Sequence, residues 1–446
     1  MIILQKITAS LPKQILGPGL IALAIKLAGA VLAYGMIVAL ARMMTTEEYG
    51  RFAFGLNLSI IAATLGGLGF PTGILRYWPK SVVAGDAAGA RGVVLMGYRY
   101  SMVTGLILIV LAAIGSVIAG ILTGHFQILQ FLAIGLLGLV ISLGDFSSNL
   151  LRAQGSTLVS MLPRDVLWRI FTVLGAGVVF SAGGAVTGPI ALIICMLVLL
   201  ALTYWQFSHV QKNIKSQLQP SPTRSHFSEI RGSLLPLWAS SVVFAMIQQF
   251  DVVVVGSLLG NAEAGAYFAA QKTAALLSLI LIAAGLVAAP SMSGLYHAGK
   301  LAELQRLCRS MAGAIVVVTA IGFTLLALVG KFLLGLFDAN FVSAYPILMI
   351  VAVGTMIDAV SGPNAYLMQM TKYETHYLKI MAVCYGLVLA AQLILVPRWG
   401  GIGAAVASAG GVVLWNVWAI YILRKDAGLD PSLLSLVSPP RKPSPG

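Results

Sequence analysis

The chain has 446 residues, of which 59% are hydrophobic and 9% are charged. A soluble globular domain has about 25% charged residues, so this composition excludes an ordinary soluble domain and indicates a polytopic membrane protein. The formal net charge of +14 does not indicate a nucleic-acid-binding domain, because the cations are spread along the chain between apolar runs.

Long apolar runs follow one another through the chain, and a membrane-spanning helix needs roughly 20 mainly apolar residues. The first run is longer than the apolar core of a signal peptide, which has roughly 7–15 residues, so we expect it to be the first membrane helix. We predict an all-α polytopic membrane protein with about twelve transmembrane helices, at residues 15–41, 53–75, 100–123, 128–151, 158–182, 186–208, 234–258, 263–290, 311–336, 344–369, 377–396 and 402–423.

The distribution of lysine and arginine predicts the orientation of these spans. Of the 28 Lys and Arg residues, 22 fall on the side that holds both termini and the even-numbered gaps, while 4 fall on the opposite side. This sorting counts Arg164 and Arg169 among the gap residues. Positive residues favour the cytoplasm, so we expect both termini to be cytoplasmic.

The two halves of the sequence repeat with an offset of 215 residues, which aligns Glu48 with Glu263 and Asn149 with Asn364. Six spans in each half is an even number, so both halves should have the same orientation and form two parallel-repeat six-helix bundles around a central cavity. The predicted divisions are an N-terminal lobe, a cytoplasmic linker, a C-terminal lobe and a disordered cytoplasmic tail, at residues 1–208, 209–233, 234–424 and 425–446.

Five charged residues are predicted inside the apolar runs. A charge in hydrocarbon costs roughly 2.5–3.5 kcal/mol on insertion scales, so such residues tend to face a partner or a water-filled cavity. They are therefore the first candidates for a functional site, namely Lys26, Asp145, Asp251, Lys272 and Asp358.

Lys26 and Lys272 lie deep in spans of opposite halves. They either attract an anionic substrate or each neutralise a buried aspartate. The polar neighbour Gln271 is expected on a cavity face.

Asp251 follows Gln248 and Gln249, which we also assign to a cavity. Its carboxylate can bind a sodium ion, carry a proton or pair with Lys272.

Asp145 and Asp358 lie near the inner ends of spans four and ten. Asp358 is followed by Gly362 and Pro363, which should kink the helix, and by Asn364, a further candidate cavity residue. Two interpretations stay open for both aspartates: a gate or ion-coupling point, or a role in helix packing only.

Signatures of enzymes are absent from the sequence. The five histidines lack metal-ligand spacing, and there is no Walker loop or GxSxG motif. We expect no catalytic activity, no cofactor and no metal. Uphill transport would then depend on a proton or sodium gradient, on the membrane potential or on removal of the substrate.

Two stretches resemble a known family. "ARMMTTEEYGRFAFGLNLSIIAATLGGLGF" resembles the region of the first and second helices of the polysaccharide biosynthesis (oligosaccharide/O-antigen) flippases, and "FDVVVVGSLLGNAEAGAYFAAQKTAAL" resembles the region of the seventh and eighth helices. The second stretch has the pattern of that family in order, at Asp251, Gly260, Gly265, Tyr267 and Lys272. The family belongs to the multidrug/oligosaccharidyl-lipid/polysaccharide (MOP) exporter superfamily.

The resemblance implies two six-helix lobes around a cavity that opens alternately to each side of the bacterial inner membrane. It implies an undecaprenyl-pyrophosphate-linked oligosaccharide as the substrate, for O-antigen (lipopolysaccharide) or exopolysaccharide synthesis, with Lys26 and Lys272 binding the pyrophosphate. Asp251 takes the place of an acid at the sodium site of a related flippase. The predicted span 377–396 has no acid, so the chain departs from that sodium site.

The resemblance also implies partners: the lipid-linked oligosaccharide, membrane lipids and other polysaccharide-assembly proteins. An ion-coupled multidrug exporter of the same superfamily is the alternative function, and acids should dominate its cavity. A membrane glycan polymerase or ligase is less favoured, because the predicted outer gaps are short.

Overall fold

The structure is a computed structural model that describes residues 13–123, 127–218 and 227–433. Every regular element in these ranges is a helix, and none of them contains a β-strand. The chain divides into two compact units, Met1–Phe250 and Asp251–Gly446, which are considered one at a time below. Parts of the predicted linker and tail lie outside the described residues, and the predicted lobe boundaries stay a prediction.

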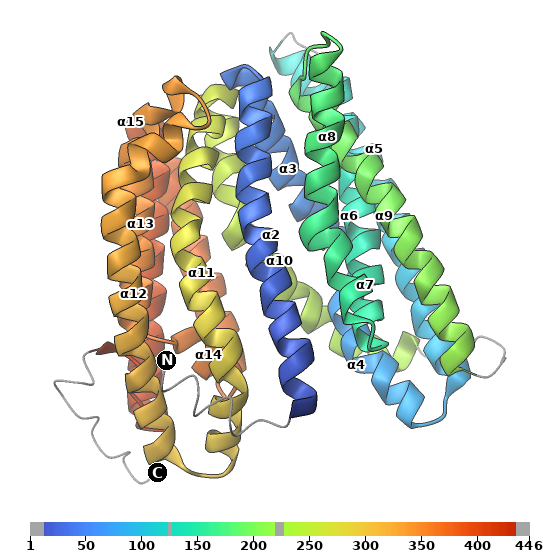
Figure 1. Cartoon of the computed structure of the whole chain (residues 1–446), viewed down its shortest axis with the longest axis vertical. Coiled ribbons are helices and arrows are strands. Elements are labelled where there is room, and N and C mark those ends of the chain that lie inside the picture. The colour runs from blue at the N-terminus through green and yellow to red at the C-terminus, as the bar shows by residue number, and fades with distance from the viewer. Residues whose placement is uncertain (1–12, 124–126, 219–226, 434–446) are drawn as a thin grey trace. The chain divides into compact units, whose positions relative to one another are not determined.

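The first unit is built around α6, which packs against α3, α4, α5, α7 and α9. Each of the six predicted spans of this half coincides with helix (Figure 1). The elements are α2 (Lys13–Met43), α3 (Thr46–Gly66), α4 (Phe70–Val83), α5 (Ala87–Thr123), α6 (Ile128–Ala153), α7 (Thr157–Leu162), the π-helix η1 (Pro163–Leu167), α8 (Trp168–Ser181), α9 (Gly188–Gln217) and the first part of α10 (Phe227–Leu259).

The second predicted span is bent. Helices α3 and α4 meet at an angle of 42°. At the break Leu68 and Gly69 have φ values of 45° and 77°, a left-handed conformation that glycine adopts without strain. A Cβ atom on Gly69 would lie 2.6 Å from the carbonyl oxygen of Leu234, so glycine also permits the close approach of α10.

The second unit contains the end of the seventh predicted span, 234–258, and the remaining five predicted spans, again all on helices. Its elements are the rest of α10, α11 (Asn261–His297), α12 (Leu301–Gly335), the 3₁₀-helix η2 (Ala339–Ala344), α13 (Tyr345–Ser361), α14 (Asn364–Gln369), α15 (Glu374–Ile422) and the π-helix η3 (Leu423–Ala427). Within the described residues eight helices are long and apolar enough to cross a membrane, and the bent pair α3 and α4 counts as a ninth when taken as one span.

Helix α15 supplies two predicted spans, 377–396 and 402–423. Its 49 residues are interrupted at Gly400, whose φ of 59° and ψ of −146° are not helical. The two halves fold back on each other, as shown by the hydrogen bond that Nε2 of Gln392 donates to Oγ of Ser408 at 3.1 Å. The predicted fold class, an all-α polytopic membrane protein of about twelve helices, is confirmed. The central cavity stays a prediction.

The segment after α15 packs on the break between α13 and α14. Asp430 is 1% exposed and accepts from the Nε atom of Arg424 at 2.9 Å, while its backbone N–H donates to Gln305 of α12 at 2.8 Å. The carbonyl of Pro431 lies against Gly362, which has a φ of 77° and no space for a side chain. The first residues of the predicted tail take part in this contact, and the disorder predicted for residues 425–446 stays a prediction.

Candidate functional site

A proline shapes the part of the first unit that carries charge. Pro163 has no N–H to donate to the carbonyl of Val159, and Nε2 of Gln206 donates to that carbonyl at 3.0 Å instead. The chain then forms the π-helix η1, a wide turn that is frequent at functional sites. In this turn the consecutive residues Arg164 and Asp165 both line one cavity.

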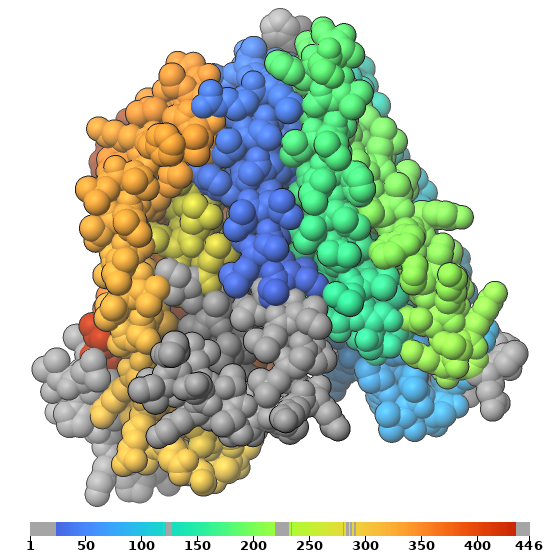
Figure 2. Space-filling view, in the orientation of Figure 1, coloured from blue at the N-terminus to red at the C-terminus, as the bar shows by residue number. Residues whose placement is uncertain are grey.

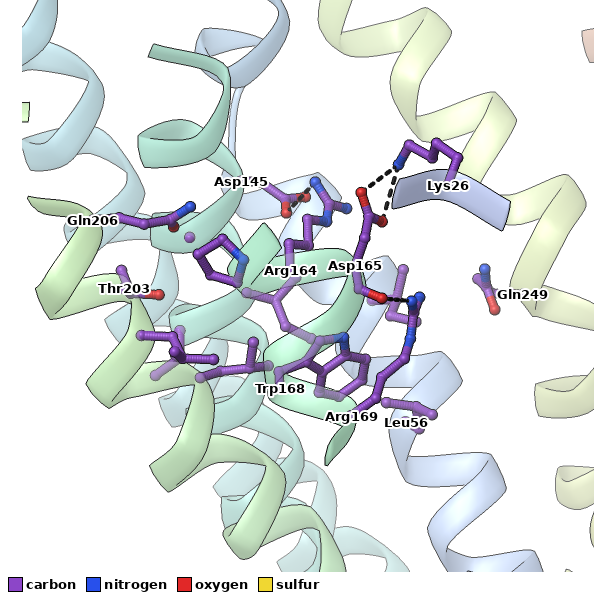
Figure 3. A pocket seen from close by; sticks show the side chains of 17 residues that line it. Lys26, Leu56, Asp145, Arg164, Asp165, Trp168, Arg169, Thr203, Gln206 and Gln249 are labelled. Carbon is purple, nitrogen blue, oxygen red and sulfur yellow. Dashed lines mark hydrogen bonds and ion pairs between the residues drawn. The ribbon is translucent and has the colours of Figure 1, made fainter. Parts of the chain in front are cut away.

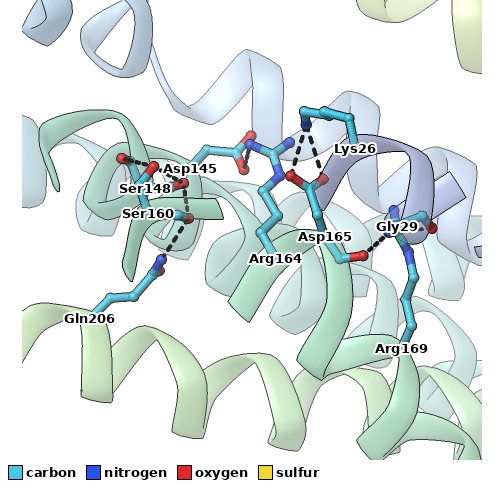
Figure 4. A network of polar contacts seen from close by, with 9 residues as sticks. All are labelled: Lys26, Gly29, Asp145, Ser148, Ser160, Arg164, Asp165, Arg169 and Gln206. Atoms are coloured by element: carbon cyan, nitrogen blue, oxygen red, sulfur yellow. Dashed lines mark hydrogen bonds and ion pairs between the residues drawn. The ribbon is translucent and has the colours of Figure 1, made fainter. Parts of the chain in front are cut away.

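A pair of serines fixes the register of α6 against α7. Oγ of Ser148 donates to the carbonyl of Ser160 at 2.7 Å, and Oγ of Ser160 donates to the carbonyl of Ser148 at 2.7 Å. Asp145 and Arg164 lie about one helical turn from these serines. Because of this register, Nη1 of Arg164 reaches Oδ1 of Asp145 at 2.7 Å (Figure 4).

Helix α2 brings Lys26 next to Asp165 of η1. Its Nζ lies 3.0 Å and 2.9 Å from the two carboxylate oxygens of Asp165. The helices approach closely because residue 29 is glycine, where a Cβ atom would lie 2.7 Å from the Asp165 carbonyl oxygen. Arg169 joins the elements, since its Nη1 donates to the carbonyls of Gly29, at 2.7 Å, and of Asp165. Figure 2 shows α2 packed along α7 and α8.

These side chains line a cavity of about 400 Å³ within the first unit (Figure 3). The cations extend into it: the side chains of Lys26 and Arg164 are 47% and 50% exposed, against 11% for Asp165 and 27% for Asp145. With Arg169, the cavity holds three cations and two carboxylates, a net charge of +1. A ligand that enters therefore meets positive charge first. Its other polar and aromatic lining includes Gln249, Gln206, Thr203 and Trp168.

The second unit has a carboxylate of a different kind. Asp251 on α10 is 5% exposed and accepts hydrogen bonds from neutral groups on two other helices. Nε2 of Gln392 donates to its Oδ1 at 2.8 Å, while the hydroxyls of Ser408 and Tyr267 donate to its Oδ2 at 2.7 Å and 3.1 Å. Within the described part of the chain no cation contacts this buried carboxylate, and these neutral donors satisfy it.

Lys272 lies on α11, in the same unit as Asp251. Its Nζ is 5.1 Å from the ring centroid of Phe268, within range of a cation–π interaction, and its charge acts on Asp251 through space. Gln271 is partly buried and Gln248 is exposed. The roles of these residues, and a joint role of Lys272 with Lys26, stay predictions.

Asp358 forms part of a chain of amides across the break between α13 and α14. Nδ2 of Asn416 donates to Oδ1 of Asp358, and Nδ2 of Asn364 donates to Oδ1 of Asn416, both at 2.9 Å. Asn364 is completely buried. The chain ties three helical segments together, as helix packing requires, and the predicted gating and cavity roles stay untested.

Sequence reasoning missed six residues of these sites. Arg164 and Arg169 were sorted among the gap residues and Asp165 was passed over, although all three fall inside the predicted span 158–182. A run of charges directly after a proline inside an apolar span was the available signal. The roles of three neutral partners of Asp251, which lie in the predicted spans eight, eleven and twelve, were also missed: Tyr267, Gln392 and Ser408.

Comparison with solved structures places this fold. An inward-facing multidrug resistance MATE family transporter of the MOP superfamily is similar, with a TM-score of 0.70, 16% identity, and 90% of this chain and 96% of that chain covered. The lipid II flippase MurJ in an inward closed conformation has a TM-score of 0.69 and 12% identity, with 91% and 88% covered. A MOP superfamily transporter from Pyrococcus furiosus has a TM-score of 0.62 and 14% identity, with 91% and 95% covered.

At these identities the likeness shows the fold alone. No curated protein matches the chain. A family model described as polysaccharide biosynthesis protein matches residues 18–296, which is more than half of the sequence. The chain therefore belongs to the polysaccharide biosynthesis protein family, and it has the fold of the MOP superfamily transporters.

Proposed function

We propose that this protein is a flippase that moves an undecaprenyl-pyrophosphate-linked oligosaccharide from the cytoplasmic to the periplasmic leaflet of the bacterial inner membrane by alternating access. The product would serve the synthesis of O-antigen or of an exopolysaccharide. The observation that carries this proposal is the cavity of the first unit, into which the cationic ends of Lys26 and Arg164 extend.

The physical chemistry of the substrate favours this reading. A pyrophosphate cannot cross hydrocarbon unaided, because its charge is too costly there. Lysine and arginine in a wet cavity offset that cost, and an arginine fork matches phosphate oxygens. Lys26, Arg164 and Arg169 are thus the proposed headgroup ligands of the first unit, with Lys272 proposed for the second.

Polar and aromatic side chains beside the cations suit the sugars. Gln249, Gln206 and Thr203 offer hydrogen-bonding groups, and Trp168 offers a flat apolar ring at the same cavity. Asp251 is the proposed proton or sodium coupling group. Asp145, for which a gating or ion-coupling role and a packing role were both left open, is assigned here to the ion pair with Arg164.

A multidrug exporter of the same superfamily is the second candidate, because one similar structure is a multidrug resistance transporter. A cationic amphiphile would meet half-exposed cations in this cavity and a net charge of +1, which opposes its binding. The charge of the cavity therefore favours the anionic substrate.

The test is transport of a fluorescent undecaprenyl-pyrophosphate oligosaccharide in proteoliposomes, with surface polysaccharide measured in cells. Lys26→Ala should reduce both by at least about tenfold while the protein still inserts, because one headgroup ligand is lost. The matched control is Lys80→Ala, which removes an exposed lysine of the same unit outside the cavity. Unchanged transport in Lys26→Ala, or drug sensitivity as the main defect of a deletion strain, would reject the proposal.

A further inference from the structure

Two carboxylates stand among the cations of the proposed headgroup site, which at first sight opposes the binding of an anion. We infer that Asp165 and Asp145 are resident counter-ions, which hold Lys26 and Arg164 while the cavity is empty and which the two phosphates of a diphosphate group displace. This inference rests on the proposed function and specifies how its site works.

The geometry separates the cations from their counter-ions. Lys26 and Arg164 have about half of their side chains accessible, whereas Asp165 and Asp145 have 11% and 27% accessible. Figure 4 shows the four side chains in a row of alternating charge, in the order Asp145, Arg164, Asp165 and Lys26. Each cation therefore offers an incoming anion more accessible surface than its carboxylate does.

The contacts resemble those that a diphosphate would make. Nζ of Lys26 touches both oxygens of Asp165, as it would touch two phosphate oxygens. The guanidinium of Arg164 holds one oxygen of Asp145 at 2.7 Å, which leaves its other nitrogens for a second acceptor. Each of these two cations is held by a single carboxylate, so we assign one phosphate of the ligand to each of them.

The third cation explains why the exchange favours the ligand. Arg169 is held by the carbonyls of Gly29 and Asp165, so its charge remains in place when the ion pairs open. With both carboxylates counted, the cavity lining has a net charge of +1, which attracts a diphosphate headgroup.

The same counter-ions limit how tightly the ligand is held. A cation without a partner at low dielectric is costly, and so is a carboxylate that loses its cation. Re-forming the two ion pairs therefore helps to expel the diphosphate after translocation. A transporter needs such release, since a substrate bound too tightly would not leave.

The direct test is isothermal titration calorimetry of the full-length protein with inorganic pyrophosphate, in nanodiscs of zwitterionic lipid. Asp165→Asn removes the competing charge and keeps the shape, so pyrophosphate should bind about tenfold more tightly. Lys26→Ala should weaken binding, and the double variant Lys26→Ala with Asp165→Asn should lose the gain. Orthophosphate, which has a single phosphate, should show a smaller gain.

The matched control is Glu47→Gln, the same loss of charge in an exposed ion pair of the first unit with Arg51, outside the cavity. It should leave pyrophosphate affinity unchanged. Equal or weaker pyrophosphate binding in a folded Asp165→Asn protein would overturn the inference. If that protein does not fold, Asp145→Asn tests the same point at Arg164.

A second arm identifies the source of the diphosphate chemistry. Nanodiscs with phosphatidylglycerol should not abolish the gain in Asp165→Asn, whereas its loss there would assign the site to ordinary anionic lipid and overturn the inference. Failure of the two proposals can be told apart. If the wild-type protein transports the lipid-linked substrate but Asp165→Asn binds pyrophosphate no more tightly, only the counter-ion inference is rejected. If Asp165→Asn binds pyrophosphate more tightly but the wild-type protein does not transport the substrate, only the flippase proposal is rejected.

Discussion

Two buried aspartates, one in each unit, are satisfied in opposite ways. Asp165 is paired with the ammonium of Lys26 from another helix, beside a cavity that a ligand can enter. Asp251 is enclosed by three neutral donors, from Gln392, Ser408 and Tyr267. An ion pair at a cavity can exchange its partner for another ion, whereas a set of hydrogen bonds around one carboxylate suits a proton or a small cation.

The difference agrees with the two separate roles that we propose for these sites, headgroup binding and ion coupling. The first unit supplies charges that suit an anionic headgroup, and the second supplies one acid with its hydrogen bonds already made. Each of the following substitutions should affect one of these sites and spare the other.

The largest effect is expected for Gly29→Val. The new side chain would collide with the Asp165 carbonyl and Arg169, so α2 must move away from η1. The ion pair of Lys26 with Asp165 and the hydrogen bond from Arg169 to the Gly29 carbonyl are then lost. We expect a loss of about 3 kcal/mol in the free energy of unfolding and a loss of transport. Thermal unfolding in micelles and the proteoliposome assay measure these.

Gly35→Val is the matched control, because nothing lies within 4 Å of a Cβ atom at residue 35 of the same helix. It should be close to wild type in both assays. Equal loss of stability and transport in the two variants would show that the loss comes from placing valine in α2 and not from the close approach at residue 29.

The next effect compares the two aspartates directly. Asp251→Ala leaves buried donors without an acceptor and should cost about 2–3 kcal/mol of unfolding free energy. Asp165→Ala should cost only about 1 kcal/mol, because Lys26 is half exposed in the cavity and can be solvated. Chemical denaturation of both variants measures the difference, and a larger cost for Asp165→Ala would contradict the contrast between the sites.

The smallest effect is expected for Ser160→Ala. It removes the hydrogen bond to the Ser148 carbonyl and should cost about 1 kcal/mol. Because this contact sets the register that joins Arg164 to Asp145, transport should fall severalfold while Asp251-dependent coupling is retained. Ser181→Ala is the control, since that hydroxyl bonds only locally, to Val178. Full transport in Ser160→Ala would show that the register does not depend on the serine pair.

Much of the fold could be predicted from the sequence. Apolar runs of membrane length are a local property, so all twelve spans coincide with helices. Gly400 lies in the gap between two predicted spans, and Gly362 lies at the kink predicted within the span 344–369. Lys26, Asp145 and Asp251 were identified because a charge inside an apolar run is costly wherever it packs.

Only the tertiary structure decided which groups meet. Lys26 and Asp165 are 139 residues apart in the chain, and Asp251 and Gln392 are 141 apart. The sequence shows that each buried charge needs a partner, but the partner is chosen by how helices pack: by the missing side chain of Gly29, the wide turn after Pro163 and the reversal at Gly400. Burial is set by the local run of residues, whereas pairing depends on distances that exist only once the helices have come together.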